Sequence, residues 1–231
     1  MLQSATPSCS LRNGDFRTVF DGIWTEQLQA DAKPYASILA YMRSRPAETH
    51  AGVLNTLTRR GSTERDALKA VCEDVADKLC AMELLEPLQR ESVFAAAVLM
   101  STRGAQPHFD GQSNAWRNRL FWALCLEDTD TDVLFGNLKI RIPLSRGTFL
   151  VFDGNQPHCV LAREHDVFMK SHFKKHRSQF FVGGDFTPKD WAALGVRHVL
   201  TAEDLVSRVD VQTMLVDQKM CTVKPGRSRA L

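Results

Sequence analysis

The sequence predicts a mainly β fold of the α+β class, in which a compact antiparallel sandwich or barrel has helical flanks before and after it. Two observations carry this prediction. From residue 92 to residue 186, short runs rich in β-branched and aromatic residues alternate with clusters of Gly, Pro, Asp and Asn. So many short strands in one stretch fit antiparallel pairing better than alternating βαβ units. Before residue 92, apolar residues recur at intervals of three and four, which is the periodicity of helices.

The N-terminal part, residues 1–91, is therefore expected to be helical. A first apolar stripe consists of Tyr35, Ile38, Leu39 and Met42. The segment Arg43–Pro46 reads as a stop between helices. The apolar face of a second predicted helix, residues 63–85, consists of Leu68, Val71, Val75, Leu79, Met82 and Leu85. Thr63 with Asp66 offers a capping box at its start.

The core, residues 92–186, contains seven predicted strands. They are Ser92–Met100, Arg119–Glu127, Asp132–Phe135, Leu138–Ile142, Gly147–Phe152, His158–Ala162 and Ser178–Val182. Helices are expected to return in residues 187–231, the first capped near Thr187 and Asp190 and the second over residues 205–215, before a basic tail. Without an internal repeat or a linker, residues 1–231 are predicted to form a single domain.

Composition limits the possible roles of the chain. Its 231 residues include 29 Lys and Arg against 27 Asp and Glu, a balance that disfavours a dedicated nucleic-acid binder. No apolar run approaches the roughly 20 residues of a membrane-spanning helix, and the N-terminus lacks the pattern of a secretory signal. The six cysteines form no CxxC pair and are expected to be reduced. A cytoplasmic location is predicted, with the nucleus as the alternative.

One constellation points to chemistry: His108 and Asp110, with His158 near the end of the β region. Residues i and i+2 of an extended segment project to the same side, so His108 and Asp110 can reach one ion, and His158 can close the site from a later strand. Two imidazoles and one carboxylate suit non-haem Fe(II), because they leave coordination positions for a co-substrate and dioxygen. The HxD triplet alone is weak, since chance gives about 0.5 such triplets per chain of this composition.

The segments PHFD, RLFWALCLE and LFGNLKIRIPLSRGTFLVFDGNQPHCV resemble the 2-oxoglutarate and Fe(II)-dependent dioxygenases, and the resemblance covers about residues 94–186. It implies a double-stranded β-helix core of jelly-roll type, with the N-terminal helices packed on the sheet. It also implies that His108, Asp110 and His158 bind iron, and that the enzyme uses Fe(II), 2-oxoglutarate and dioxygen.

The resemblance also calls for an Arg or Lys that holds the far carboxylate of 2-oxoglutarate, a task that suits the planar fork of a guanidinium. Arg177 and Ser178 are preferred, because Ser178 starts the last predicted strand and the resemblance implies an Arg with a nearby Ser or Thr at that place. Arg163 is disfavoured, since alternation along the strand from His158 turns it outward, away from the metal. Arg119, on the strand after the HxD loop, is a further alternative.

The resemblance implies that 2-oxoglutarate is decarboxylated to succinate and CO2 while a C–H bond of the substrate is oxidised, with hydroxylation as the default. Asn114 and Trp116, in the loop after the HxD motif, are predicted to line the substrate mouth. The expected substrate is a small molecule or an amino-acid-type compound, and no membrane partner is expected.

Two other interpretations remain. The first is oxidation of a nucleobase in the manner of the TET/JBP group; the basic cluster KSHFKKHR and the basic tail favour it, and the weak net charge opposes it. The second belongs to another class, a non-catalytic β-sandwich module in which the same three residues hold a metal or nothing. Structural zinc would want a fourth protein ligand, and none is obvious. The sequence predicts nothing about the oligomeric state.

Overall fold

The computed structural model describes residues 22–44, 62–108, 119–135, 140–154, 156, 158–174 and 178–194, with the backbone alone at 106–108. It also describes the backbone of six short strands. These are β1 (Leu2–Ser4), β2 (Thr18–Phe20), β4 (Val53–Leu54), β13 (Arg197–Val199), β14 (Val216–Asp217) and β15 (Thr222–Val223).

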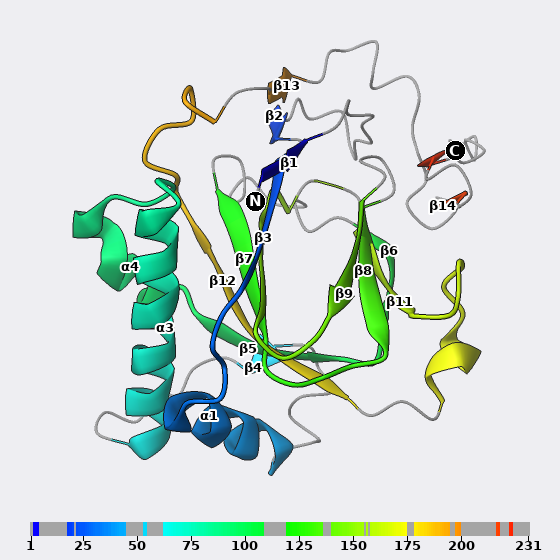
Figure 1. The fold of residues 1–231 in the computed structure, drawn as a ribbon, viewed down its shortest axis with the longest axis horizontal. Coiled ribbons are helices and arrows are strands. Elements are labelled where there is room, and N and C mark those ends of the chain that lie inside the picture. The colour runs from blue at the N-terminus through cyan, green and yellow to red at the C-terminus, as the bar shows by residue number, and fades with distance from the viewer. Residues whose placement is uncertain are drawn as a thin grey trace, which may run out of the picture.

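The core consists of two antiparallel sheets that face each other (Figure 1). The larger sheet has the order β1-β3-β10-β7-β12-β5-β4, and the smaller has the order β6-β11-β8-β9. Their main strands are β3 (Gly22–Gln27), β5 (Val98–Thr102), β6 (Ala105–His108), β7 (Leu120–Cys125), β8 (Thr131–Phe135), β9 (Ile140–Leu144), β10 (Thr148–Phe152), β11 (His158–Ala162) and β12 (Gln179–Phe186).

The strand order defines a jelly roll. From β5 to β12 the chain crosses between the two sheets at every connection except the one between β8 and β9, which are neighbours in the smaller sheet. Each sheet thus receives four of these eight strands, and all of their pairings are antiparallel. This is the double-sheet arrangement that closes most strand edges of a small all-β core.

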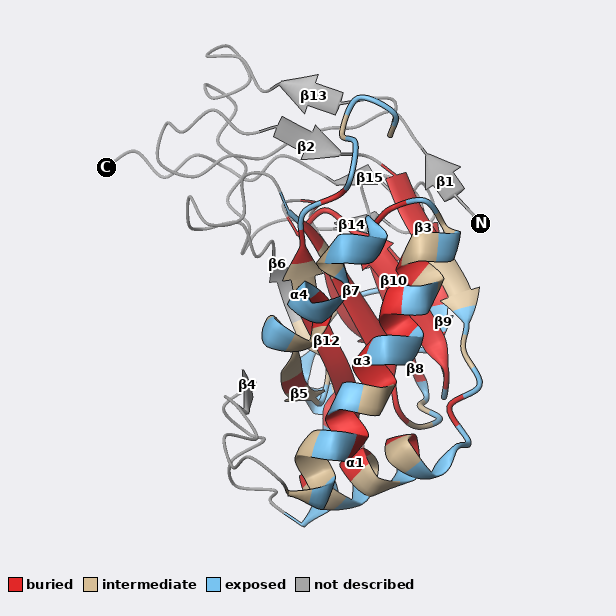
Figure 2. Cartoon of the chain, turned by 90° about the vertical axis from the view of Figure 1, so that its left-hand side faces the viewer, coloured by how far each residue is buried: buried red, intermediate tan, exposed pale blue. Residues whose placement is uncertain are grey.

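Three helices lie along the outer face of the larger sheet: α1 (Lys33–Arg43), α3 (Thr63–Ala81) and α4 (Arg90–Ala95), the last preceded by the 3₁₀ turn η1 (Pro87–Gln89) (Figure 2). Their apolar residues share one buried cluster with side chains of the sheet such as Trp122 and Phe149. The Tyr35 hydroxyl of α1 donates a hydrogen bond to Asp74 of α3 at 2.8 Å. One face of the sheet is therefore closed to solvent.

Alternation along the strands separates this outer cluster from an inner one. On β12, Phe180, Val182 and Phe186 belong to the helix-side cluster, whereas Phe181 belongs to the cluster between the two sheets. The inner cluster also takes residues such as Phe135 and Phe152 from β8 and β10. The inner faces of the two sheets therefore enclose the interior of the jelly roll.

Three cysteines, called here the buried thiols, are Cys72 in the helix-side cluster, Cys125 in the inner cluster, and Cys159 in a small third cluster with Leu134 and Leu161. Burial raises the pKa of each from the ordinary value of 9.0 to about 12. Protonated thiols of this kind behave as small apolar side chains.

The structure confirms the six predicted strands from β7 to β12, within a few residues at their ends, and both N-terminal helices. The helix α1 ends at Arg43, at the predicted stop, and α3 ends at Ala81, before the predicted Leu85. The predicted cap at Thr63 is wrong by one residue, because Ser62 accepts the hydrogen bond from the Arg65 amide at 3.2 Å.

Two predictions in the N-terminal half are wrong. The region up to residue 91 is not all helical, since β3 pairs with β1 and β10 in the larger sheet. Its Ile23 faces the inner cluster and Trp24 the outer one, so both faces are buried and no simple alternation of apolar and polar residues appears. The strand predicted at Ser92–Met100 begins as helix α4, whose Val93 is buried in the helix-side cluster, and the strand β5 starts only at Val98.

The C-terminal helix predicted after Thr187 is also wrong. Asp190 does cap the amides of Ala192 and Ala193, at 2.8 and 3.2 Å, but the segment up to Leu194 consists of turns. A glycine follows at position 195, which does not favour continuation of a helix. The second helix, predicted over residues 205–215, lies outside the described residues.

Candidate functional site

Two of the predicted metal ligands occupy facing positions on neighbouring strands. The last residue of β6, His108, is the register partner of the first residue of β11, His158. Residues directly opposite each other in an antiparallel pair have Cα atoms about 4.5 to 5.5 Å apart and share one face of the sheet. The fold therefore brings together two histidines that lie 50 positions apart in the sequence.

The pairing of β6 with β11 contains an irregularity, and this irregularity places His108 opposite His158. His158 pairs with His108, but Val160, two residues on, pairs with Ala105, three residues back. One extra residue on β6 is the signature of a β-bulge, and Pro107, which has no amide hydrogen, lies within it. Ala105 and Val160 both belong to the inner cluster. Without the bulge, strict alternation would put position 108 on the outer face.

The His158 side chain is buried, 8% exposed, at the start of β11. Its Nδ1 lies 2.8 Å from the Gln156 carbonyl oxygen, which can only accept, so Nδ1–H is the donor. In the neutral imidazole this tautomer leaves the lone pair on Nε2. A backbone acceptor on the other ring nitrogen is the usual way in which a metal-binding histidine is oriented.

An aromatic cluster surrounds the His158 ring. Phe152 meets it edge to face at 5.0 Å between ring centroids, and Phe135 lies 5.8 Å away. Phe121 contacts Phe152 at 5.5 Å. These phenylalanines come from the ends of β8 and β10 and the start of β7, so they mark the same end of the jelly roll as His158. They make the wall on this side of the site apolar.

Arg119 and Asp185 lie at this same end. They form an ion pair between the residue before β7 and the end of β12. Arg119 is the alternative residue for binding the co-substrate, and in that role the co-substrate would compete with Asp185 for the guanidinium.

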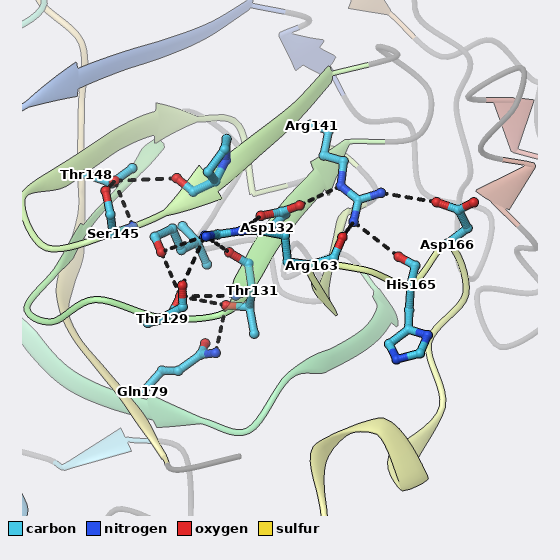
Figure 3. A network of polar contacts seen from close by, with 12 residues as sticks. Thr129, Thr131, Asp132, Arg141, Ser145, Thr148, Arg163, His165, Asp166 and Gln179 are labelled. Carbon is cyan, nitrogen blue, oxygen red and sulfur yellow. Dashed lines mark hydrogen bonds and ion pairs between the residues drawn. The ribbon is translucent and has the colours of Figure 1, made fainter. Parts of the chain in front are cut away.

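Arg163 lies at the opposite end of β11, on the outer face of the smaller sheet (Figure 3). Its Nε donates to Asp132 Oδ1 at 3.0 Å, and Arg141 donates to the other oxygen of the same carboxylate at 2.7 Å. Arg163 also donates to the carbonyls of Thr129 and Thr131. The outward direction expected from strand alternation is the direction observed.

Ser178 immediately precedes β12, and its hydroxyl lies 3.4 Å from Arg103 Nε, the donor. Its neighbour Gln179 faces the other way, into the interior, where its Nε2 donates to the Thr131 hydroxyl at 2.7 Å (Figure 3). Gln179 is 3% exposed, and within the described part of the chain its Oε1 accepts no hydrogen bond.

Other predicted site residues lie outside the described residues: Asp110, Asn114, Trp116 and Arg177. The side chain of His108 is also outside them. Among the side chains that are described, no three His, Cys, Asp or Glu residues gather closely enough to hold a metal ion. None of the described helices is long and apolar enough to span a membrane.

Sequence reasoning missed the surroundings of His158. The aromatic wall was not predicted, although Phe135 and Phe152 end two predicted strands and so offered a signal. Asp185 was missed because the last strand was predicted to end at Val182, whereas β12 continues to Phe186. Gln156 contributes through its backbone, which no side-chain pattern reveals.

No protein-family model and no curated protein sequence matches the chain. Solved structures similar to it are prolyl hydroxylases and other non-haem 2-oxoglutarate-dependent oxygenases. A prolyl-4-hydroxylase from Pseudomonas putida is 16% identical, with 73% of this chain and 93% of that chain covered and a TM-score of 0.41.

Two further structures are similar at the same level. The α-ketoglutarate-dependent epimerase SnoN of nogalamycin biosynthesis is 14% identical, covers 74% of this chain and 83% of its own, and has a TM-score of 0.42. The viral collagen prolyl hydroxylase of Paramecium Bursaria Chlorella virus-1 is 11% identical, with coverages of 71% and 89% and a TM-score of 0.40. At these identities and scores the neighbours assign no activity to this chain.

Proposed function

We propose that the chain is an Fe(II)- and 2-oxoglutarate-dependent oxygenase that hydroxylates a C–H bond of a small molecule or an amino-acid-type compound. The observation that carries the proposal is the register of β6 and β11, which pairs the histidine of the HxD motif with the distal histidine, His158. The imidazole of His158 is buried and oriented at the same end of the jelly roll.

The donors fit an Fe(II) ion. Nδ1 of His158 is held by a carbonyl, so Nε2 is the ligating nitrogen. Position 108 shares its face of the sheet, and Asp110 follows two residues later with a carboxylate, the third member of the ligand set. When bound, Fe(II) with 2-oxoglutarate and dioxygen would supply the oxidising chemistry, with succinate and CO2 as co-products.

The protein's own contribution is to position groups and to exclude water. Phe135 and Phe152 pack on the His158 ring and restrict its rotation, so Nε2 keeps one direction. The same apolar wall shields one side of the site from solvent, which protects a reactive centre from side reactions.

The co-substrate needs a cation for its far carboxylate, and Arg177 remains the preferred residue. Arg163 is engaged by Asp132 on the outer face, and Arg119 by Asp185. Arg177 precedes the inward-facing Gln179 by two positions, the interval at which residues of an extended chain share a face.

The test is anaerobic addition of Fe(II) and 2-oxoglutarate to the full chain, with the visible charge-transfer band of their chelate as the readout. The wild-type protein should give the band, and His158→Ala should lose it because one ligand is missing. The matched control is His165→Ala, which removes an exposed imidazole stacked on His172 at 3.6 Å and distant from the site.

Absence of the band, together with absence of succinate formation in air, would favour the metal-binding β-sandwich module over the oxygenase. Retention of the full band by the His158 variant would show that this imidazole is not a ligand.

A further inference from the structure

The Arg119–Asp185 ion pair lies on the inner face of the larger sheet. Asp185 is the register partner of Phe121, whose ring packs against the inner cluster. The pairing of β12 with β7 is regular from Phe181 to Phe186, so Asp185 shares the inner face with Phe181. Arg119 precedes Phe121 by two residues and is the diagonal neighbour of Asp185 on that face, within reach of a long side chain.

The pair also lies at the end of the jelly roll that carries the histidines. Phe121, opposite Asp185, is 5.5 Å from Phe152, and Phe152 is 5.0 Å from the His158 ring. Two aromatic rings thus connect the ion pair to the proposed metal ligand. A molecule with its charged head at the pair and a short carbon chain along the rings would present a C–H bond near His158.

The pair retains unused binding capacity. One Arg119 nitrogen contacts one Asp185 oxygen, and within the described residues neither side chain makes another polar contact. The side chain of Asp185 is 19% exposed and that of Arg119 is 47% exposed. A carboxylate with a free oxygen suits an ammonium group, and a guanidinium with free N–H groups suits a carboxylate as a planar fork.

We propose that Arg119 and Asp185 bind the charged head of a free α-amino acid as the prime substrate, Asp185 taking the ammonium and Arg119 the carboxylate. This inference rests on the proposed function and specifies its substrate class. The two charges of the amino acid and those of Arg119 and Asp185 then alternate in sign around a ring, so each charge lies between two opposite charges. Arg119 is thereby a substrate residue and not the anchor of 2-oxoglutarate.

The experiment uses the full chain with Fe(II), 2-oxoglutarate and air, and measures succinate release above the rate without substrate. The probes are the twenty standard L-amino acids, each compared with its N-acetyl and its carboxamide derivative. At least one amino acid should raise succinate release, and its two derivatives should not, because each lacks one of the two charges.

Two conservative variants locate the effect. Asp185→Asn and Arg119→Gln should each raise the KM for that amino acid by about 10- to 100-fold, the value of a charge-assisted hydrogen bond. The KM for 2-oxoglutarate should change less than about twofold, a split that general loss of structure does not produce. The matched control is Glu127→Gln, which removes the charge from a similar pair with Arg43 beyond the other end of β7, where the side chains of Glu127 and Arg43 are 14% and 55% exposed.

Three results would overturn the inference and leave the oxygenase intact: a visible Fe(II) chelate band with no response to any amino acid, an equal response to the N-acetyl derivative, or an effect of Arg119→Gln on 2-oxoglutarate alone. The first two need no variant, so misfolding of a variant does not obscure them. Loss of the band itself would overturn the proposed function, and the inference with it.

Discussion

The carboxylate of Asp132 is expected to be one of the most costly single charges to remove from this protein. Its side chain is 5% exposed and is held between two guanidinium groups, at 2.7 Å from Arg141 and 3.0 Å from Arg163. Arg141 further donates to the carbonyls of Arg163 and His165, so the network fixes the start of the β11–β12 connection against the smaller sheet (Figure 3).

Asp132→Asn preserves the shape and removes the charge. A hydrogen bond to a charged group contributes about 1.5 to 3 kcal/mol, and two are weakened here. The arginine side chains are 28% and 43% exposed, so water compensates for part of the loss. The expected fall in the free energy of unfolding is about 2 to 4 kcal/mol, a large share of the about 5 to 15 kcal/mol typical of a domain.

Urea denaturation followed by far-UV circular dichroism measures this, provided that the m-values of variant and wild type agree. The matched control is Asp166→Asn, which removes a 68% exposed carboxylate 3.2 Å from the same Arg141 and should cost less than about 1 kcal/mol. A loss below about 1 kcal/mol for Asp132→Asn, or an equal loss for the control, would refute the reasoning.

Four other outcomes are expected. Arg177→Ala should raise the KM for 2-oxoglutarate at least about tenfold, whereas Arg163→Ala should lower stability and leave that KM unchanged; the reverse pattern would exchange their roles. Gly104→Ala should lower the free energy of unfolding in urea by about 2 kcal/mol or more, because φ is +98° there and a Cβ would lie 2.3 Å from the Phe173 ring. Phe173 lies in the β11–β12 connection, so proteolytic cleavage of that connection should also become faster, and an unchanged rate of cleavage would contradict this. His158→Ala should cost about 1 to 3 kcal/mol, since a buried ring between two phenylalanines is removed, and a cost near zero would mean that the ring is not packed. The pKa of each buried thiol is about 12 in the folded state and about 9 in the unfolded state, so only the unfolded chain loses these protons between those pH values. The free energy of unfolding should therefore fall from pH 9 upward, by at most about 2 kcal/mol per thiol at about pH 10.5, and a flat profile between about pH 8 and 10.5 would refute this.

The sequence predicted the secondary structure correctly where the apolar pattern of a segment matches the burial of its residues in the fold. The strands from β7 to β12 have β-branched and aromatic runs bounded by turn residues, and Tyr35 and Met42 marked a helix face that the structure buries. Alternation from His158 was enough to turn Arg163 outward. In each case the residues of one short segment are enough to determine its secondary structure or the direction of its side chain.

The remainder depended on contacts between distant segments. The strand β6 was not predicted, because Pro107 disfavours a strand and only pairing with β11 makes one. The strand β12 extends to Phe186 because β7 supplies a partner for Asp185 and Phe186. The tautomer of His158 depends on a carbonyl two residues earlier, whose position is set by the turn after β10.

The bulge in β6 determines which changes in strand length this site can tolerate. Deleting the extra residue would give a regular pair with β11 in which the histidine still lies opposite His158. An added residue that no further bulge absorbs would instead shift the register by one and move that position to the other face of the sheet. In this protein the length of a strand, and not only the identity of its residues, therefore decides whether the two histidines lie opposite each other.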